Sequence, residues 1–461
     1  MTKDMTSGSP AKLIFGFAIP MFLGLLFQQF YSMVDTLIVG KFLGVNPLAG
    51  VGSTTSLNFM VLGFCMGVCN GFAIPVAQMF GAKEEHRLRR YVTNGAWLCI
   101  VFSIVMTLVV VTVCRPVLVL MQTPEEIFEY AYVYIVIVFW GIPCTFLYNI
   151  LAAIIRSLGD SKTPVIFLAI SSGINIVLDL VFVLVFDMGV EGPAIATVLA
   201  QGISGIICLF YMYRKFPVLH ASRDEWKPEL HYMGKLCFIG IPMGLQYSIT
   251  AIGSVIIQAA VNSLGSVAVA SVAAAVKINM FLCCPYDAMG STMATYAGQN
   301  VGAGKFDRLK QGEKSCTLLG LVYGIVAFIF ILLFGKYLAL LFVDVSEEVI
   351  INQAHLFLMC NSAFYFPLAL VNIFRFTIQG MGFSRLAILA GVCEMIGRTV
   401  VAFVFVPIFG YSAVCFASPV AWILADCFLV PAFFFCVRSL EKRAALEDRQ
   451  AVLEDKQEDK N

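Results

Sequence analysis

The chain has 461 residues, of which 60% are hydrophobic and 13% are charged, and its formal net charge is +1. A mean hydropathy of +0.88 excludes an ordinary soluble domain. The near-zero net charge gives no indication of the strong positive field that binds nucleic acid. The composition therefore predicts a membrane protein that crosses the lipid bilayer many times.

Long apolar segments follow one another along almost the whole chain. A spanning helix needs roughly 20 predominantly apolar residues, and twelve segments meet this requirement. Their hydrophobicity is continuous rather than alternating, which predicts helices and not an outer-membrane barrel. The segments lie near residues 13–40, 48–78, 92–114, 127–155, 164–186, 192–214, 233–262, 267–298, 315–335, 350–380, 386–407 and 413–437.

Short motifs of the first half recur in the second half. The recurring pairs are Ile19-Pro20-Met21 with Ile241-Pro242-Met243, Leu43-Gly44 with Leu264-Gly265, Gln78-x-x-Gly81 with Gln299-x-x-Gly302, and Asn149 and Gly159 with Asn372 and Gly382. Six spans, an even number, precede the second copy, so both copies enter the membrane in the same sense. This pattern predicts an all-α polytopic protein whose twelve helices form two six-helix lobes, parallel repeats related by a pseudo-two-fold axis, with a substrate path between them.

The polar segments divide the chain into four parts. We predict a first lobe over residues 1–213, a linker over 214–235, a second lobe over 236–440 and a charged tail over 441–461. Lys and Arg are concentrated in every second connection, including the linker and the tail. The positive-inside rule makes that side cytoplasmic, so we expect a multi-pass protein of the inner membrane with both termini in the cytoplasm.

No motif for ATP hydrolysis or catalysis is present. Gly304-Lys305 resembles the end of a P-loop, but Gln299 occupies its first glycine position and Phe306 its Ser/Thr position. The four histidines are scattered, and no Cys/His spacing is typical of a zinc site. We therefore expect no enzyme activity, no ATP and no cofactor, and energy that comes from an ion gradient.

Two aspartates lie within apolar spans and have no Lys or Arg nearby in the same span. They are Asp35, in the first span, and Asp179, in the fifth. A carboxylate at a helix centre costs about 2.5–3.5 kcal/mol even on the most lenient insertion scale, so such acids are usually functional. Without a fixed cation, each carboxyl group must be protonated or bind a mobile cation.

Further oxygen ligands are close to these acids in the sequence. Asn175 lies four residues before Asp179, on the same helical face, and Thr197 lies in the sixth span. Asp35, Asn175, Asp179 and Thr197 together predict a site for Na⁺ or for a proton shared by the two acids. Gln28 and Tyr31 follow the same helical stripe as Asp35 and are candidates for a substrate cavity.

At these residues the chain resembles the multidrug and toxic compound extrusion (MATE) transporters, in particular their prokaryotic DinF- and MepA-like members. The resemblance rests on Val34-Asp35-Thr36-Leu37-Ile38-Val39-Gly40, on the Gly189–Thr197 segment, on the Pro20/Pro242 pair and on the twelve-span pattern. It implies coupling to H⁺ or Na⁺ at Asp35, Asn175, Asp179 and Thr197. It also implies antiport of organic cations or amphipathic compounds, with cargo and lipid as the partners.

The second copy lacks an unpaired acidic pocket of this kind. Gln246 and Gln258 occupy its first span, so a second cation site there is in doubt. We expect Glu394 to pair with Arg398, and the remaining membrane charges Lys277, Asp287, Arg375 and Asp426 to pair across helices. Two alternatives remain: a flippase for a lipid-linked precursor, which would need a strongly cationic cavity, and a receptor or scaffold that transports nothing.

Overall fold

The computed structural model describes residues 4–458, and the side chains of residues 4–446. This part of the chain is helical and contains no strand. The first half forms α1 (Pro10–Ile38), α2 (Val45–Ser53), α3 (Thr55–Ala82), α4 (Glu85–Leu120), α5 (Glu125–Trp140), α6 (Ile142–Ser157), α7 (Lys162–Leu180) and α8 (Glu191–Lys215). The second half forms α9 (Leu230–Asn262), α10 (Ser266–Gly302), α11 (Phe306–Ala339), α12 (Glu348–Ala363), α13 (Tyr365–Gly380), α14 (Ser384–Val400), α15 (Val406–Phe409) and α16 (Tyr411–Glu458).

The helices confirm the all-α fold with up to twelve spans. Ten are long and apolar enough to cross a membrane, and two bent pairs, α5 with α6 and α12 with α13, can each make one further span. The pairs bend by 48° and 52°. Each pair is the fourth span of its half, so the bend is part of the repeated unit.

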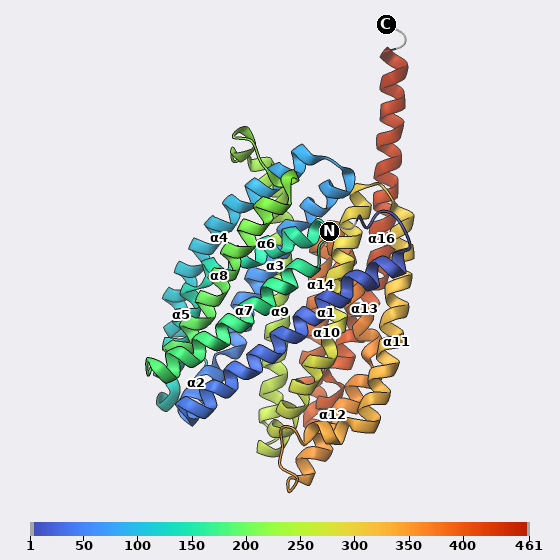
Figure 1. Cartoon of the computed structure of the whole chain (residues 1–461). Coiled ribbons are helices and arrows are strands. Elements are labelled where there is room, and N and C mark those ends of the chain that lie inside the picture. Colours follow the sequence, from blue (N-terminus) through green and yellow to red (C-terminus); the bar gives the residue numbers. More distant parts are fainter. Residues whose placement is uncertain (1–3, 459–461) are drawn as a thin grey trace.

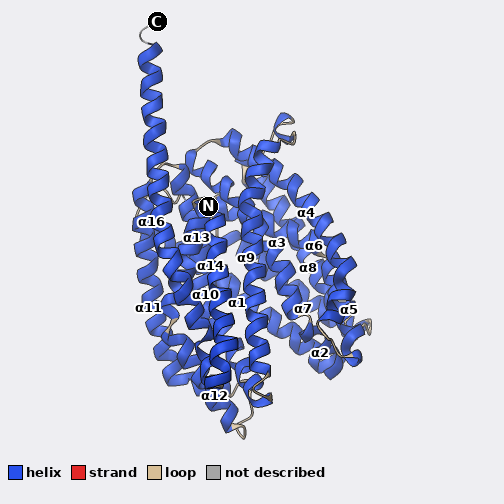
Figure 2. Cartoon of the chain, turned by 180° about the vertical axis from the view of Figure 1, so that it is seen from behind, coloured by secondary structure: helices blue, strands red, loops and turns tan. Residues whose placement is uncertain are grey.

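The halves form two bundles that pack in a repeated pattern (Figures 1 and 2). The first helix of each bundle lies at the boundary. α1 packs against α7 of its own bundle and α10 of the other, and α9 packs against α14 of its own bundle and α3 of the other. This exchange between equivalent helices is what a pseudo-two-fold axis between parallel repeats requires.

The second span differs between the two copies. α10 is continuous, whereas its counterpart breaks at Thr54 into α2 and α3. Thr54 is buried, and its hydroxyl donates to the carbonyl oxygen of Val51 (2.7 Å). α2 then turns against α5, so closely that a Cβ on Gly50 would lie 2.7 Å from Cβ of Tyr130. The sequence predicted one uninterrupted span over 48–78, because Gly50 and Gly52 before the break do not by themselves show that a helix ends there.

The basic connections, among them those after α3, α8 and α10, lie at one end of the bundle, uppermost in Figure 1, which we call the basic end. The two bundles meet there through hydrogen bonds that repeat. Gln78 Nε2 donates to the carbonyl oxygen of Gly380 (3.1 Å), and Gln299 Nε2 donates to that of Ser157 (2.9 Å). Gln299 follows Gln78 by 221 residues, and Gly380 follows Ser157 by 223 residues. The same separations relate Leu43 to Leu264 and Asn149 to Asn372 in the sequence repeat. Each bundle thus holds the other by the same contact.

Two glycines allow this close approach. A Cβ on Gly81 would lie 1.9 Å from the carbonyl oxygen of Gln299, and one on Gly302 would lie 1.7 Å from that of Gln78. No side chain fits where backbones are this close. The repeated motif Gln-x-x-Gly therefore encodes a crossing of α3 and α10 at which glutamine supplies the hydrogen bond and glycine supplies the space.

The N-terminal segment before α1 reinforces the basic end. Met5 is fully buried, and its N–H donates to Gln299 Oε1 (2.9 Å). Its carbonyl oxygen accepts from Asn300 Nδ2 (3.2 Å) and Arg308 Nη2 (3.3 Å). Because α16 also contacts this end, through an ion pair between Lys310 and Glu441 (2.7 Å), the described ends of the chain lie on the same side.

The connection between the two halves folds back onto α4. Glu225 pairs with Arg89 (2.8 Å), and its carbonyl oxygen accepts from Thr93 Oγ1 (2.6 Å). Trp97 Nε1 donates to the carbonyl oxygen of Trp226 (3.0 Å). Burial opposes ionisation of Glu225, but hydrogen bonds from Ser222 and Arg89 outweigh it and lower the pKa of its carboxyl group. The connection is therefore fastened to the first bundle.

The crossing of α3 and α10 can be tested with Gly81→Ala. The new methyl group meets a backbone carbonyl that no side-chain rotation can move away, so the helices must separate and the Gln299 contacts weaken. We expect a loss of about 1–3 kcal/mol, as for other overpacked positions, measured as a lower thermal unfolding midpoint in detergent.

The matched control is Gly234→Ala in α9, where an added Cβ meets no atom within 4 Å. It should leave the midpoint unchanged or raise it slightly, because Ala is the better helix former. Equal midpoints for the two variants would contradict the close crossing.

Candidate functional site

Asp35 and Asp179 come together between α1 and α7. Each lies in the last third of its span, toward the end opposite the basic connections. Asp179 is fully buried and Asp35 is half-buried. Their carboxyl groups interact directly with each other where α1 packs on α7. The structure thus places the two sequence-predicted acids in one pocket, although 144 residues separate them.

The pocket needs a positive charge that the described side chains do not supply. If both acids are ionised, Asp35 Oδ1 and both carboxyl oxygens of Asp179 have no donor among the described residues. A hydrogen bond between two carboxyl groups requires a proton on one of them. A proton or a small cation would therefore offset the free-energy cost of burying these oxygens.

Asn175 and Thr197 add an amide oxygen and a hydroxyl oxygen to the acidic pocket. Asn175 is buried, and its Nδ2 donates to Thr197 Oγ1 (3.4 Å). This leaves Asn175 Oδ1 without a donor among the described residues. Carboxylate, amide and hydroxyl oxygens are hard ligands that suit Na⁺. Among the described residues no group of three His, Cys, Asp or Glu side chains could hold a metal ion, so a cation here would depend on Asn175 and Thr197 as well as on the acids.

Two tyrosines border the acidic pocket. Tyr31, predicted from the helical stripe, and Tyr134 of α5 both lie within electrostatic reach of Asp35 and Asp179. Sequence reasoning missed Tyr134, because nothing in the sequence distinguishes it from the nearby Tyr130 and Tyr132. Gln28 lies two turns before Asp35 on α1 and is partly exposed.

The helices that carry the acids change geometry directly after them. α1 continues as a π-helical segment over Val39–Leu43, and α7 does so over Val181–Val185. These two segments contact each other. Single turns of π-helix interrupt α-helices often at functional sites. The two in the first bundle lie next to the acidic pocket, and a third follows α14 in the second bundle, over Val401–Phe405.

The second bundle uses its charges differently. Glu394 accepts hydrogen bonds from Arg375 and, at 3.2 Å, from Arg398. The predicted pair of Glu394 with Arg398 is therefore confirmed. The prediction that Arg375 pairs across helices is also confirmed, because Arg375 on α13 pairs with Glu394 on α14. All three side chains are buried, so two arginines neutralise Glu394.

The other predicted cross-helix pairs do not form. Lys277 lies over the ring of Phe342 (5.8 Å to the ring centre), and neither Asp287 nor Asp426 is in an ion pair with a described residue. Glu313 of α11 is a further buried acid that sequence reasoning missed. It accepts a hydrogen bond from Thr377 (2.8 Å), but it precedes the apolar part of its helix and so did not stand out.

Comparison with known proteins identifies relatives that span most of the chain. The family model described as MatE matches residues 20–181 and 242–404. The probable multidrug resistance protein YpnP of Bacillus subtilis is 29% identical over 82% of this chain and 83% of its own length. The multidrug export protein MepA of Staphylococcus aureus (strain N315) is 21% identical over 89% and 90%. A solved outward-facing structure of a multidrug resistance MATE family transporter shares the fold, with a TM-score of 0.89 at 20% identity over 95% of this chain and 98% of that one.

The charge cluster of the second bundle predicts a stability effect. Glu394→Gln leaves Arg375 and Arg398 buried without a carboxylate, which typically costs about 3–5 kcal/mol. We expect a large fall in the thermal unfolding midpoint in detergent. Glu129→Gln removes the partner of an exposed arginine, Arg115, and should change the midpoint little. Equal effects of the two substitutions would contradict the buried cluster.

The acidic pocket predicts that the protein binds its ion in the absence of any gradient. Acidification or added Na⁺ should raise the unfolding midpoint, since a ligand that binds only the folded state stabilises it. Asp179→Asn supplies an amide donor and removes the charge, so the response should vanish. Asp187→Asn makes the same chemical change at an exposed loop position and should keep it. An undiminished response in Asp179→Asn would show that the ion binds elsewhere.

Proposed function

Because the chain belongs to the MatE family of multidrug and toxic compound extrusion transporters, we propose that it is an antiporter that exports organic cations or amphipathic compounds in exchange for H⁺ or Na⁺. The family consists of transporters and not of enzymes. The acidic pocket is the observation that carries this proposal. It combines two adjacent carboxyl groups, no basic partner among the described residues, and a place inside membrane-spanning helices.

We assign the coupling ion to Asp35, Asn175, Asp179 and Thr197. Three of these side chains have oxygens without a donor among the described residues, so an arriving proton or Na⁺ finds acceptors that need no rearrangement. Protonation converts one carboxylate into a donor to the other, whereas Na⁺ is held by all the oxygens at once. Both ions cancel the repulsion between the two carboxylates.

Occupation of the pocket would then drive the change of access. α1 contacts both bundles, since it packs against α7 and α10 alike. A change of charge beside Asp35 therefore acts on the helix at the boundary of the lobes. An ion can shift this equilibrium only if it binds one arrangement more tightly than the other, and the π-helical segments after Asp35 and Asp179 are where we expect the backbone to differ.

The cargo would enter between the lobes, with Tyr31 and Gln28 of α1 as candidate contacts. We place the protein in the inner membrane. By the positive-inside rule its basic end and both of its termini face the cytoplasm. We keep residues 1–213 and 236–440 as the lobes, 214–235 as the linker and 441–461 as the tail. The lipid-linked precursor flippase is not favoured, because the relatives reported above are named as multidrug resistance or export proteins.

Transport in liposomes tests this function. Purified protein should move a cationic dye when either a proton or a sodium gradient is imposed separately, and the effective gradient identifies the ion. Asp35→Asn and Asp179→Asn should each lose most of this flux at equal protein content, while Asp187→Asn should retain it. Full gradient-driven flux in both pocket variants would overturn the assignment.

A further inference from the structure

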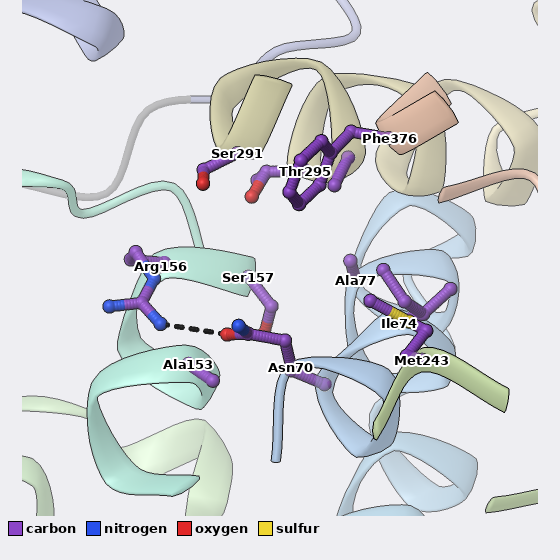
Figure 3. A pocket seen from close by; sticks show the side chains of 12 residues that line it. Asn70, Ile74, Ala77, Ala153, Arg156, Ser157, Met243, Ser291, Thr295 and Phe376 are labelled. Atoms are coloured by element: carbon purple, nitrogen blue, oxygen red, sulfur yellow. Dashed lines mark hydrogen bonds between the residues drawn. The ribbon is translucent and has the colours of Figure 1, made fainter. Parts of the chain in front are cut away.

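A small cavity lies between the lobes, near the basic end and away from the acidic pocket. α3 and α6 of the first lobe form one side, and α10 with parts of α9 and α13 forms the other (Figure 3). Its water-accessible space is about 40 Å³. This exceeds the roughly 10–15 Å³ that one water needs but is too small for a drug-sized molecule. The cavity suits one polar group at the end of a larger compound.

Arg156 supplies the only charged side chain among the residues that line this cavity. Its Nη2 donates to Asn70 Oδ1 (3.0 Å) (Figure 3). This bond uses one of the five N–H groups of the guanidinium. The titratable groups within electrostatic reach are Tyr148, Tyr247, Cys208 and Cys69. All of these are neutral at pH 7 in their ordinary state, so the guanidinium has no counter-charge among the described residues.

Hydroxyl groups face the arginine from the other lobe. Ser291 and Thr295 lie one turn apart on α10 and line the cavity opposite Arg156 (Figure 3). Neither hydroxyl makes a hydrogen bond to another described residue, whereas Thr292, which points elsewhere on α10, donates to its own helix (2.7 Å). The cavity thus combines a guanidinium with free N–H groups and two hydroxyls that have no partner in the described part of the chain.

The second copy of the internal repeat carries no arginine at this position. Arg156 corresponds to Gln379 under the shift of 223 residues that relates Ser157 to Gly380. Gln379 is buried and donates a hydrogen bond to Gln246. A neutral amide therefore occupies the equivalent place in the bent helix pair of the second lobe. The positive charge is particular to the first copy, beside the cavity.

We propose that Arg156, with Ser291 and Thr295, binds an oxyanion, the carboxylate or phosphate group of an amphipathic cargo. Guanidinium groups hold such anions by paired hydrogen bonds, and the hydroxyls of α10 supply further donors from the opposite lobe. The inference rests on the proposed function in one respect: we take the space between the lobes to be the place of the cargo. Within the proposed cargo class it predicts a preference for compounds that also carry an anionic group, such as zwitterions.

A pair of dyes that differ only at one group tests the site. A xanthene dye with a free carboxylate and the methyl ester of the same dye are titrated against the full-length protein, and binding is read by fluorescence polarisation without any gradient. The wild type should bind the carboxylate dye at least tenfold more tightly than the ester. Arg156→Gln should reduce this ratio to about one without weakening the ester, and Arg156→Lys should keep part of the preference.

The source of the oxyanion is decided by a second arm. Inorganic phosphate in solution and phosphatidic acid in nanodiscs of phosphatidylcholine are compared by their effect on the unfolding midpoint. A rise with phosphatidic acid that Arg156→Gln abolishes assigns the site to a lipid headgroup, and one with inorganic phosphate assigns it to a soluble cargo. Arg115→Gln, at an exposed arginine near the opposite end of α4, should respond as the wild type does.

Two results would overturn the oxyanion site. One is a carboxylate preference that survives Arg156→Gln, and the other is a lack of any Arg156-dependent response to both dyes, to phosphate and to phosphatidic acid. Because no gradient is used, these readouts are separate from ion coupling. Loss of flux in Asp35→Asn with an intact dye preference would support both proposals, and an intact preference without ion-driven flux in the wild type would reject only the antiport.

Discussion

The hydrogen bonds from Gln78 to Gly380 and from Gln299 to Ser157 hold the two lobes together at the basic end. Each is a side-chain amide that satisfies a carbonyl oxygen of the other lobe at the end of a helix, where that oxygen has no partner of its own helix. Gly81 and Gly302 make room for the contact. The floor of the inter-lobe cavity, the position of Arg156 and the docking of Met5 on Gln299 all depend on this crossing.

The same contact must be released if the lobes are to change their arrangement. It consists of a few hydrogen bonds and backbone contacts, with little apolar side chain between α3 and α10 at the glycines. Hydrogen bonds of this kind contribute only about 0.5–1.5 kcal/mol each on balance. The contact at the glycines is therefore specific in its geometry, and a small apolar cluster that includes Ile74, Met243 and Phe376 packs across the lobes beside it.

The charge clusters of the two lobes differ in their partners. In the second lobe two arginines neutralise Glu394. In the first lobe Asp35 and Asp179 face each other without a cation, and Arg156 lies without an anion near the other end. Burying a charged group without a partner is unfavourable. We therefore expect the two aspartates to bind a small cation and Arg156 to bind an oxyanion, both from solution or membrane.

The amino-acid sequence by itself determined the helical class, the spans, the duplication and the pair of acids, because apolar length, repeated motifs and membrane-embedded carboxylates are local properties of the chain. Only the tertiary structure decided that Asp35 lies beside Asp179, that Arg375 pairs with Glu394 and that Tyr134 borders the acidic pocket. It also decided that the second span breaks at Thr54 and that α2 packs on α5. Each of these depends on which helices are neighbours, and a hydropathy pattern states how long a helix is but not which side chain it faces.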